Sequence, residues 1–80
     1  MSALDQARLD WVTKHLKLTH YIYELAADGD MIGKAYRCAI DKRGHLIERQ
    51  INFARTHILS TRPNADLDET NTVINEEQPK

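Results

Sequence analysis

Apolar residues recur at the period of an α-helix in two long stretches of this 80-residue chain. The steps between them are mostly three, four or seven residues, which places them on one face of a helix. The pattern therefore predicts two long amphipathic helices that pack through these faces. The first stripe, within residues 1–27, comprises Leu4, Ala7, Trp11, Leu18, Ile22 and Leu25, and the second, within residues 34–59, comprises Tyr36, Ile40, Ile47, Ile51, Ala54 and Ile58.

Two glycine-containing segments mark where these helices can end. Asp28-Gly29-Asp30 is typical of a turn, and Asp30 is of a type that caps a following helix. Gly44 either lies within one long second helix or ends one helix before another begins. The predicted fold is all-α: an antiparallel helical hairpin, with or without a break near Gly44, that we expect to dimerise into a bundle.

A strand interpretation competes for residues 18–54. Asp28-Gly29 also suits a two-residue hairpin turn, and residues 41–44 suit a type I turn with a glycine bulge. This alternative is an α+β fold in which one N-terminal helix packs on a three-stranded antiparallel meander. Valine occurs only at Val12 and Val73, and this scarcity of a strong strand former favours the helical fold.

The chain changes in character after Arg62-Pro63. Residues 63–80 have few apolar residues and carry five acidic and one basic side chain, a net charge of −4. Residues 34–62 carry seven basic and two acidic side chains, a net charge of +5, although the whole chain has a net charge of −1. This composition predicts one small folded domain, residues 1–62, and a flexible acidic tail, residues 63–80. The tail either covers the basic segment or is a free solubilising terminus.

The sequence argues against several classes of protein. A single cysteine excludes a disulfide framework, and with no visible signal or membrane-spanning segment it favours a cytoplasmic location. Cys38 and the four histidines lack the local spacing of zinc ligands. A small helical hairpin also offers little concavity for a substrate. We therefore expect no catalytic residue, no metal site and no cofactor, and no motif indicates a particular family.

Each expected helix carries a second apolar strip beside its core-facing stripe. A two-helix hairpin would leave these strips exposed, and exposed apolar strips are typical of interfaces. The sequence thus predicts a small non-catalytic regulatory protein that binds another protein and pairs with a second copy of itself. The candidate partner interface comprises Leu9, Val12, Leu16, Tyr23, Met31, Leu46 and Phe53.

The basic segment supports an alternative function in nucleic-acid binding. Its basic side chains are interleaved with aromatic residues, a combination that can neutralise phosphates and stack on bases. Against this, the sequence pI of about 6.4 is low, and Asp41 and Glu48 make the basic surface one of mixed charge. The candidate polyanion-binding residues are Arg37, Lys42, Arg43, Arg49 and Arg55.

Overall fold

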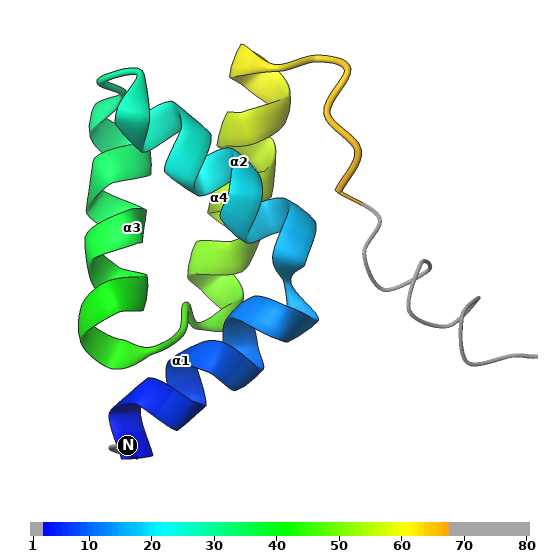
Figure 1. The fold of residues 1–80 in the computed structure, drawn as a ribbon. Coiled ribbons are helices and arrows are strands. Elements are labelled where there is room, and N and C mark those ends of the chain that lie inside the picture. Colours follow the sequence, from blue (N-terminus) through cyan, green and yellow to red (C-terminus); the bar gives the residue numbers. More distant parts are fainter. Residues whose placement is uncertain (1–2, 68–80) are drawn as a thin grey trace, which may run out of the picture.

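The computed structural model describes residues 3–67, which form four α-helices and no strand (Figure 1). The all-α prediction is confirmed for this part of the chain, and the alternative with a β-meander is not supported. No helix of residues 3–67 is long and apolar enough to cross a bilayer. The helices are α1 (Ala3–Lys14), α2 (Leu16–Ala27), α3 (Met31–Arg43) and α4 (Glu48–Thr61).

The central element of the fold is α2, which packs against both α3 and α4. Figure 1 shows α1 lying across the end of the molecule where α3 passes into α4. At the turn between α2 and α3, Asp30 caps α3 as expected, because its side chain accepts the N–H of Gly33. Gly33 also lets the two helices approach closely, since a Cβ there would lie 2.8 Å from the Ala26 nitrogen.

The core is built largely from the two predicted stripes. Leu18 and Ile22 of α2, Ile40 of α3 and Ile58 of α4 are the largest fully buried side chains. Each such side chain stabilises the fold by about 1.5–3 kcal/mol through removal of apolar surface from water. Leu25 and Ala54 are buried with them, and Trp11, Tyr36 and Ile51 pack against this core while partly buried.

The predicted first helix is divided in two at His15, a break that no proline or glycine signals. His15 has φ −120° and ψ 48°, outside the helical region. Its N–H still bonds to the carbonyls of Trp11 and Val12, and its ring stacks on the Trp11 indole with centroids 4.3 Å apart. The bend lets α1 contact α3 as well as α2, which gives α1 a second packing partner.

Gly44 ends α3, so of the two possibilities that the sequence left open at this residue, the structure shows the break. It has φ +86°, in the left-handed region, and its N–H bonds to the Ile40 carbonyl. The break changes which apolar residues face inward. Leu46 is only 2% exposed and belongs to the core, whereas Ile47, expected in the core, is 41% exposed. The apolar stripe predicted for residues 34–59 was drawn with one continuous helical period. The left-handed backbone at Gly44 interrupts that period, so the residues after it face in different directions.

Residues 63–67 pack against the helices, so the folded part continues past the boundary expected at residue 62. Leu67 is 7% exposed and joins the core. Arg55 donates a hydrogen bond to its carbonyl at 2.9 Å, and Lys17 donates one to Asp66 at 2.7 Å. The rest of the predicted acidic tail, residues 68–80, lies outside the described residues.

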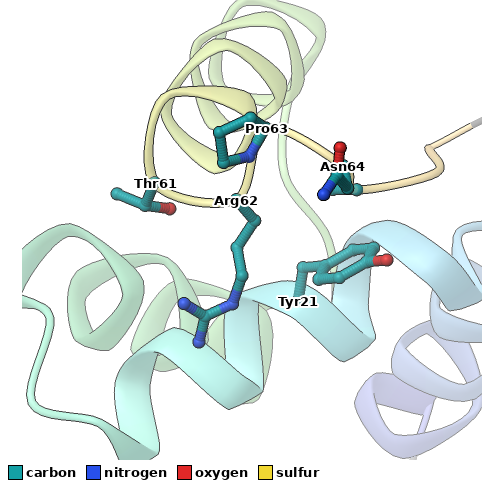
Figure 2. Close-up of a pocket in the computed structure, with 6 residues that line it drawn as sticks. Tyr21, Thr61, Arg62, Pro63 and Asn64 are labelled. Carbon is teal, nitrogen blue, oxygen red and sulfur yellow. The ribbon is translucent and has the colours of Figure 1, made fainter.

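Arg62 fixes the start of this C-terminal segment on α2. Its Nη2 donates to Asp28 Oδ2 at 2.7 Å, and its Nε lies 3.6 Å from Glu24 Oε1. The hydrogen bond to Asp28 raises the pKa of Arg62. Figure 2 shows the Arg62 side chain reaching from the end of α4 to α2, with Tyr21 below Asn64. The segment is thus held by an ion-pair cluster at its start and by Leu67 at its other end.

Candidate functional site

An apolar groove lies along the junction of α1 and α2. It holds about 380 Å³. Leu9 and Val12 of α1 are about one helical turn apart, and Leu16 begins α2 on the other side of the bend. Because the helices meet at an angle at His15, side chains from both of them line the same hollow. The residues that line this α1–α2 groove are Arg8, Leu9, Val12, Leu16, Thr19, His20 and Tyr23.

The groove brings together four of the predicted interface residues, Leu9, Val12, Leu16 and Tyr23. Leu9 is 45% exposed and Leu16 is 59% exposed, so both present aliphatic surface to water. Val12 and Tyr23 are partly buried and pack against the core. The groove therefore combines two exposed side chains with a floor that the core supports.

Tyr23 is held in place by its hydroxyl group. This hydroxyl donates to Asp41 Oδ1 at 2.7 Å, and the Arg37 guanidinium carbon lies 5.2 Å from the ring centroid. Burial, together with the hydrogen bond to Asp41, raises the pKa of Tyr23. Arg8 Nε also lies 3.5 Å from Asp41 Oδ1. Asp41 of α3 thus fixes groove residues from both α1 and α2.

Thr19 contributes a buried hydroxyl to the groove. The residue is 7% exposed, and its Oγ1 has no hydrogen-bond partner among residues 3–67. Leaving a buried polar group unpaired costs about 1–3 kcal/mol, so this hydroxyl lowers the stability of the fold. The sequence did not identify Thr19 and His20 as candidate interface residues. They lie three and four residues after Leu16 in α2, a spacing that places them on the same side of that helix.

The other predicted interface residues do not line this groove. Met31 is 79% exposed at the start of α3, and Phe53 is 51% exposed on α4. The Phe53 ring makes an edge contact with Tyr36, with centroids 6.2 Å apart. Leu46 is buried in the core because the turn after Gly44 points it inward. It is therefore not part of the candidate interface.

The candidate polyanion-binding residues are partly engaged within the protein. Arg37 Nε lies 3.9 Å from Asp41, Arg43 donates to Gln50, and Arg55 donates to the Leu67 carbonyl. Lys42 shares a hollow on α3 with Lys34, Arg37, Cys38 and Asp41. Arg49 is exposed on α4. Three of the five side chains therefore have a partner among residues 3–67.

Three histidines make polar contacts with a carboxylate or a backbone carbonyl. His57 Nε2 lies 2.9 Å from Asp30 Oδ2, His20 Nε2 lies 3.5 Å from Glu24, and His45 contacts the Arg43 carbonyl. The hydrogen bond from the Gly33 N–H, and then the one from His57, lower the pKa of Asp30. Within residues 3–67, no three His, Cys, Asp or Glu side chains converge in a way that could hold a metal ion.

No protein-family model, no curated protein and no solved structure matches this chain.

Proposed function

We propose that the chain is a small non-catalytic interaction protein of the cytoplasm that binds and modulates a protein partner through the α1–α2 groove. The observation that carries this proposal is the convergence of Leu9, Val12 and Leu16 on one hollow from two helices. Exposed aliphatic side chains gain free energy when a partner removes them from water, at about 25 cal/mol per Å². A groove of this kind suits the apolar face of a peptide or helix.

We also propose that the chain pairs with a second copy of itself through α3 and α4. Met31 and Phe53 supply large exposed apolar side chains there. A chain of this size buries a limited fraction of its surface when it folds alone, so self-association would add apolar burial. A dimer formed in this way leaves the α1–α2 groove accessible to a partner.

The alternative function is that of a nucleic-acid-associated regulator that uses the basic segment. The cluster of Lys34, Arg37 and Lys42 on α3 supports it. The internal hydrogen bonds of Arg43 and Arg55 weigh against it. Retention on heparin at about 50 mM salt that falls steeply as salt rises would favour this alternative, and no retention would remove it.

The test of the proposed function compares two leucines of equal exposure. Leu9 lies in the groove and Leu59 lies on α4, and both are 45% exposed. The immobilised wild type, Leu9→Asp and Leu59→Asp proteins are incubated with extract from the source cells. We expect a protein that binds the wild type and Leu59→Asp and binds Leu9→Asp at least about tenfold more weakly, a loss of about 1.4 kcal/mol.

Circular dichroism of both variants provides the folding control for this comparison. Equal loss of binding in Leu9→Asp and Leu59→Asp, with both variants folded, would contradict a role for the groove. Equal retention by all three proteins would contradict it as well.

A further inference from the structure

We propose that the surface of α2 and α4 beneath residues 65–67 is a second peptide-binding site, distinct from the α1–α2 groove. Its partner is an extended protein segment that carries a small residue, an acidic residue and a leucine in succession. In the free protein the site holds Ala65-Asp66-Leu67 of the same chain, which we call the docked segment. Binding of the partner displaces the docked segment.

The docked segment packs on the helices in the manner of an extended peptide. Residues 65–67 form neither helix nor turn, and their burial alternates. Leu67 is 7% exposed and belongs to the core, Ala65 packs against the core while partly buried, and the Asp66 side chain between them is 64% exposed. An extended chain points successive side chains to opposite sides. The surface therefore holds two apolar side chains and leaves the residue between them at its edge.

Side chains of both helices bind the polar groups of the docked segment. The Tyr21 hydroxyl of α2 accepts the N–H of Asp66 at 3.3 Å, and Arg55 of α4 donates to the Leu67 carbonyl at 2.9 Å. Lys17 Nζ lies 2.7 Å from Asp66 Oδ2. The two backbone contacts are available to any extended chain, whereas Lys17 selects an acidic side chain and the buried position selects leucine.

The start of this C-terminal stretch is attached only loosely. Residues 61–65 and Tyr21 line a hollow of about 310 Å³ (Figure 2). The ion pair of Arg62 with Asp28 joins side chains that are 35% and 63% exposed, and exposed pairs of this kind add little stability. Leu67 is therefore the main anchor, and its release opens the docked segment without unfolding the four helices.

The same hollow gives a partner an advantage over the docked segment. The docked segment is tethered to the site, which gives it a high effective concentration that a partner must overcome. A partner with a large apolar side chain at the position of Asn64 fills the hollow that residues 3–67 leave open beside Tyr21. Burial of that side chain adds affinity that Asn64 does not supply. The preferred partner sequence is thus a large apolar residue followed by a small residue, an acidic residue and leucine.

The experiment uses the full chain and a capped peptide of residues 63–67 that carries Asn64→Phe. The protein is Leu67→Ala, in which the docked segment lacks its anchor. Leu67→Val is studied beside it, because it keeps an apolar anchor and disturbs the fold less. We expect saturable shifts of the Lys17 and Tyr21 amide signals in NMR spectra, with an affinity at least about tenfold higher for Leu67→Ala than for the wild type and intermediate for Leu67→Val. A matched peptide that retains Asn64 should bind about fivefold more weakly.

An exchange of charge then tests the contact between Lys17 and Asp66. Lys17→Glu, made in the Leu67→Ala protein, should weaken binding of the peptide about fivefold. A peptide that also carries Asp66→Lys should recover this affinity. A merely structural effect of Lys17→Glu would not be reversed by a change in the peptide.

Absence of shifts at Lys17 and Tyr21 in both Leu67→Ala and Leu67→Val, at millimolar peptide, would overturn the proposal. Failure of the Asp66→Lys peptide to recover binding would overturn it as well. Shifts of the same signals when the wild type alone is diluted would assign the site to a second copy of the chain and not to a separate partner. No residue of the α1–α2 groove is altered in these measurements, so their failure is distinct from a failure of the proposed function.

Discussion

His57 of α4 contacts both carboxylate oxygens of Asp30, the residue that caps the start of α3. Its Nε2 lies 3.0 Å from Oδ1 and 2.9 Å from Oδ2, and the two side chains are only 18% and 21% exposed. Asp30 Oδ1 also accepts the N–H of Gly33 at 2.8 Å. A single carboxylate therefore caps α3 and joins it to α4.

The first prediction separates the two contacts of Asp30. Asp30→Ala removes both, and we expect the free energy of unfolding to fall by about 1–2 kcal/mol from the lost cap alone. Asp30→Asn keeps an acceptor for the Gly33 N–H and removes only the negative charge beside His57. It should therefore lower the free energy of unfolding by less than Asp30→Ala does. Urea denaturation near neutral pH measures both values. Equal losses in the two variants would show that the cap contributes nothing.

The second prediction concerns acid stability. The hydrogen bond from Gly33 lowers the pKa of Asp30 below its ordinary value of 3.8. The folded protein therefore holds this proton less tightly than the unfolded chain. The resulting stabilisation is complete above the unfolded value and is lost as pH falls through the lower pKa of the folded state. The difference in stability between the wild type and Asp30→Asn should shrink below about pH 4, and a constant difference in denaturation midpoints would contradict this.

The third prediction concerns Gly44, where the structure decides between two sequence expectations. Alanine would stabilise a continuous helix, but here Gly44 has φ +86° and a Cβ would lie 3.0 Å from the Arg8 nitrogen. We expect Gly44→Ala to lower the melting temperature, with backbone strain costing about 1–2 kcal/mol. Gly29→Ala is the control, because Gly29 has φ +95° and nothing within 4 Å of the added Cβ. If Gly44→Ala lowers the melting temperature no more than Gly29→Ala does, the close approach of α1 to this turn does not contribute to the loss of stability.

The fourth prediction tests whether residues 63–67 belong to the folded domain. Leu67 is 7% exposed in the core, whereas Leu59 is 45% exposed on α4. Leu67→Ala should lower the free energy of unfolding by about 2–4 kcal/mol through the lost burial and the cavity left behind. Leu59→Ala should change it by less than about 1 kcal/mol. Equal small effects in chemical denaturation would place Leu67 in a detached tail.

The fifth prediction concerns self-association. Sedimentation equilibrium should report a dimer at micromolar concentration, and Phe53→Ser should shift it to monomer because Phe53 is 51% exposed on the proposed surface. Leu16→Ser, at 59% exposure in the α1–α2 groove, is the control and should leave the dimer intact. A wild-type protein that is monomeric at these concentrations would contradict the proposed dimer. If only Leu16→Ser dissociated the dimer, the dimer interface would lie in the α1–α2 groove and not on α3 and α4.

The sequence predicted the helical class and indicated the cap at Asp30, because each depends on residues close together in the chain. It left open whether the second helix breaks at Gly44 or continues through it. Helical periodicity also identified Leu18, Ile22, Ile40 and Ile58 as core residues. For the candidate groove it found four of the seven lining residues. Arg8, Thr19 and His20 were missed, because a polar residue shows its place in a groove only when the neighbouring helix is known.

The amino-acid sequence by itself determined that this chain forms helices and which faces of α2, α3 and α4 supply most of the core. Only the tertiary structure decided the bend at His15, the inward position of Leu46 and the docking of Leu67. No local signal distinguishes these outcomes, since the bend is stabilised by contact of α1 with α3, and Leu46 and Leu67 by burial among distant residues. Periodicity reports one helix at a time, whereas these features depend on how separate helices pack together.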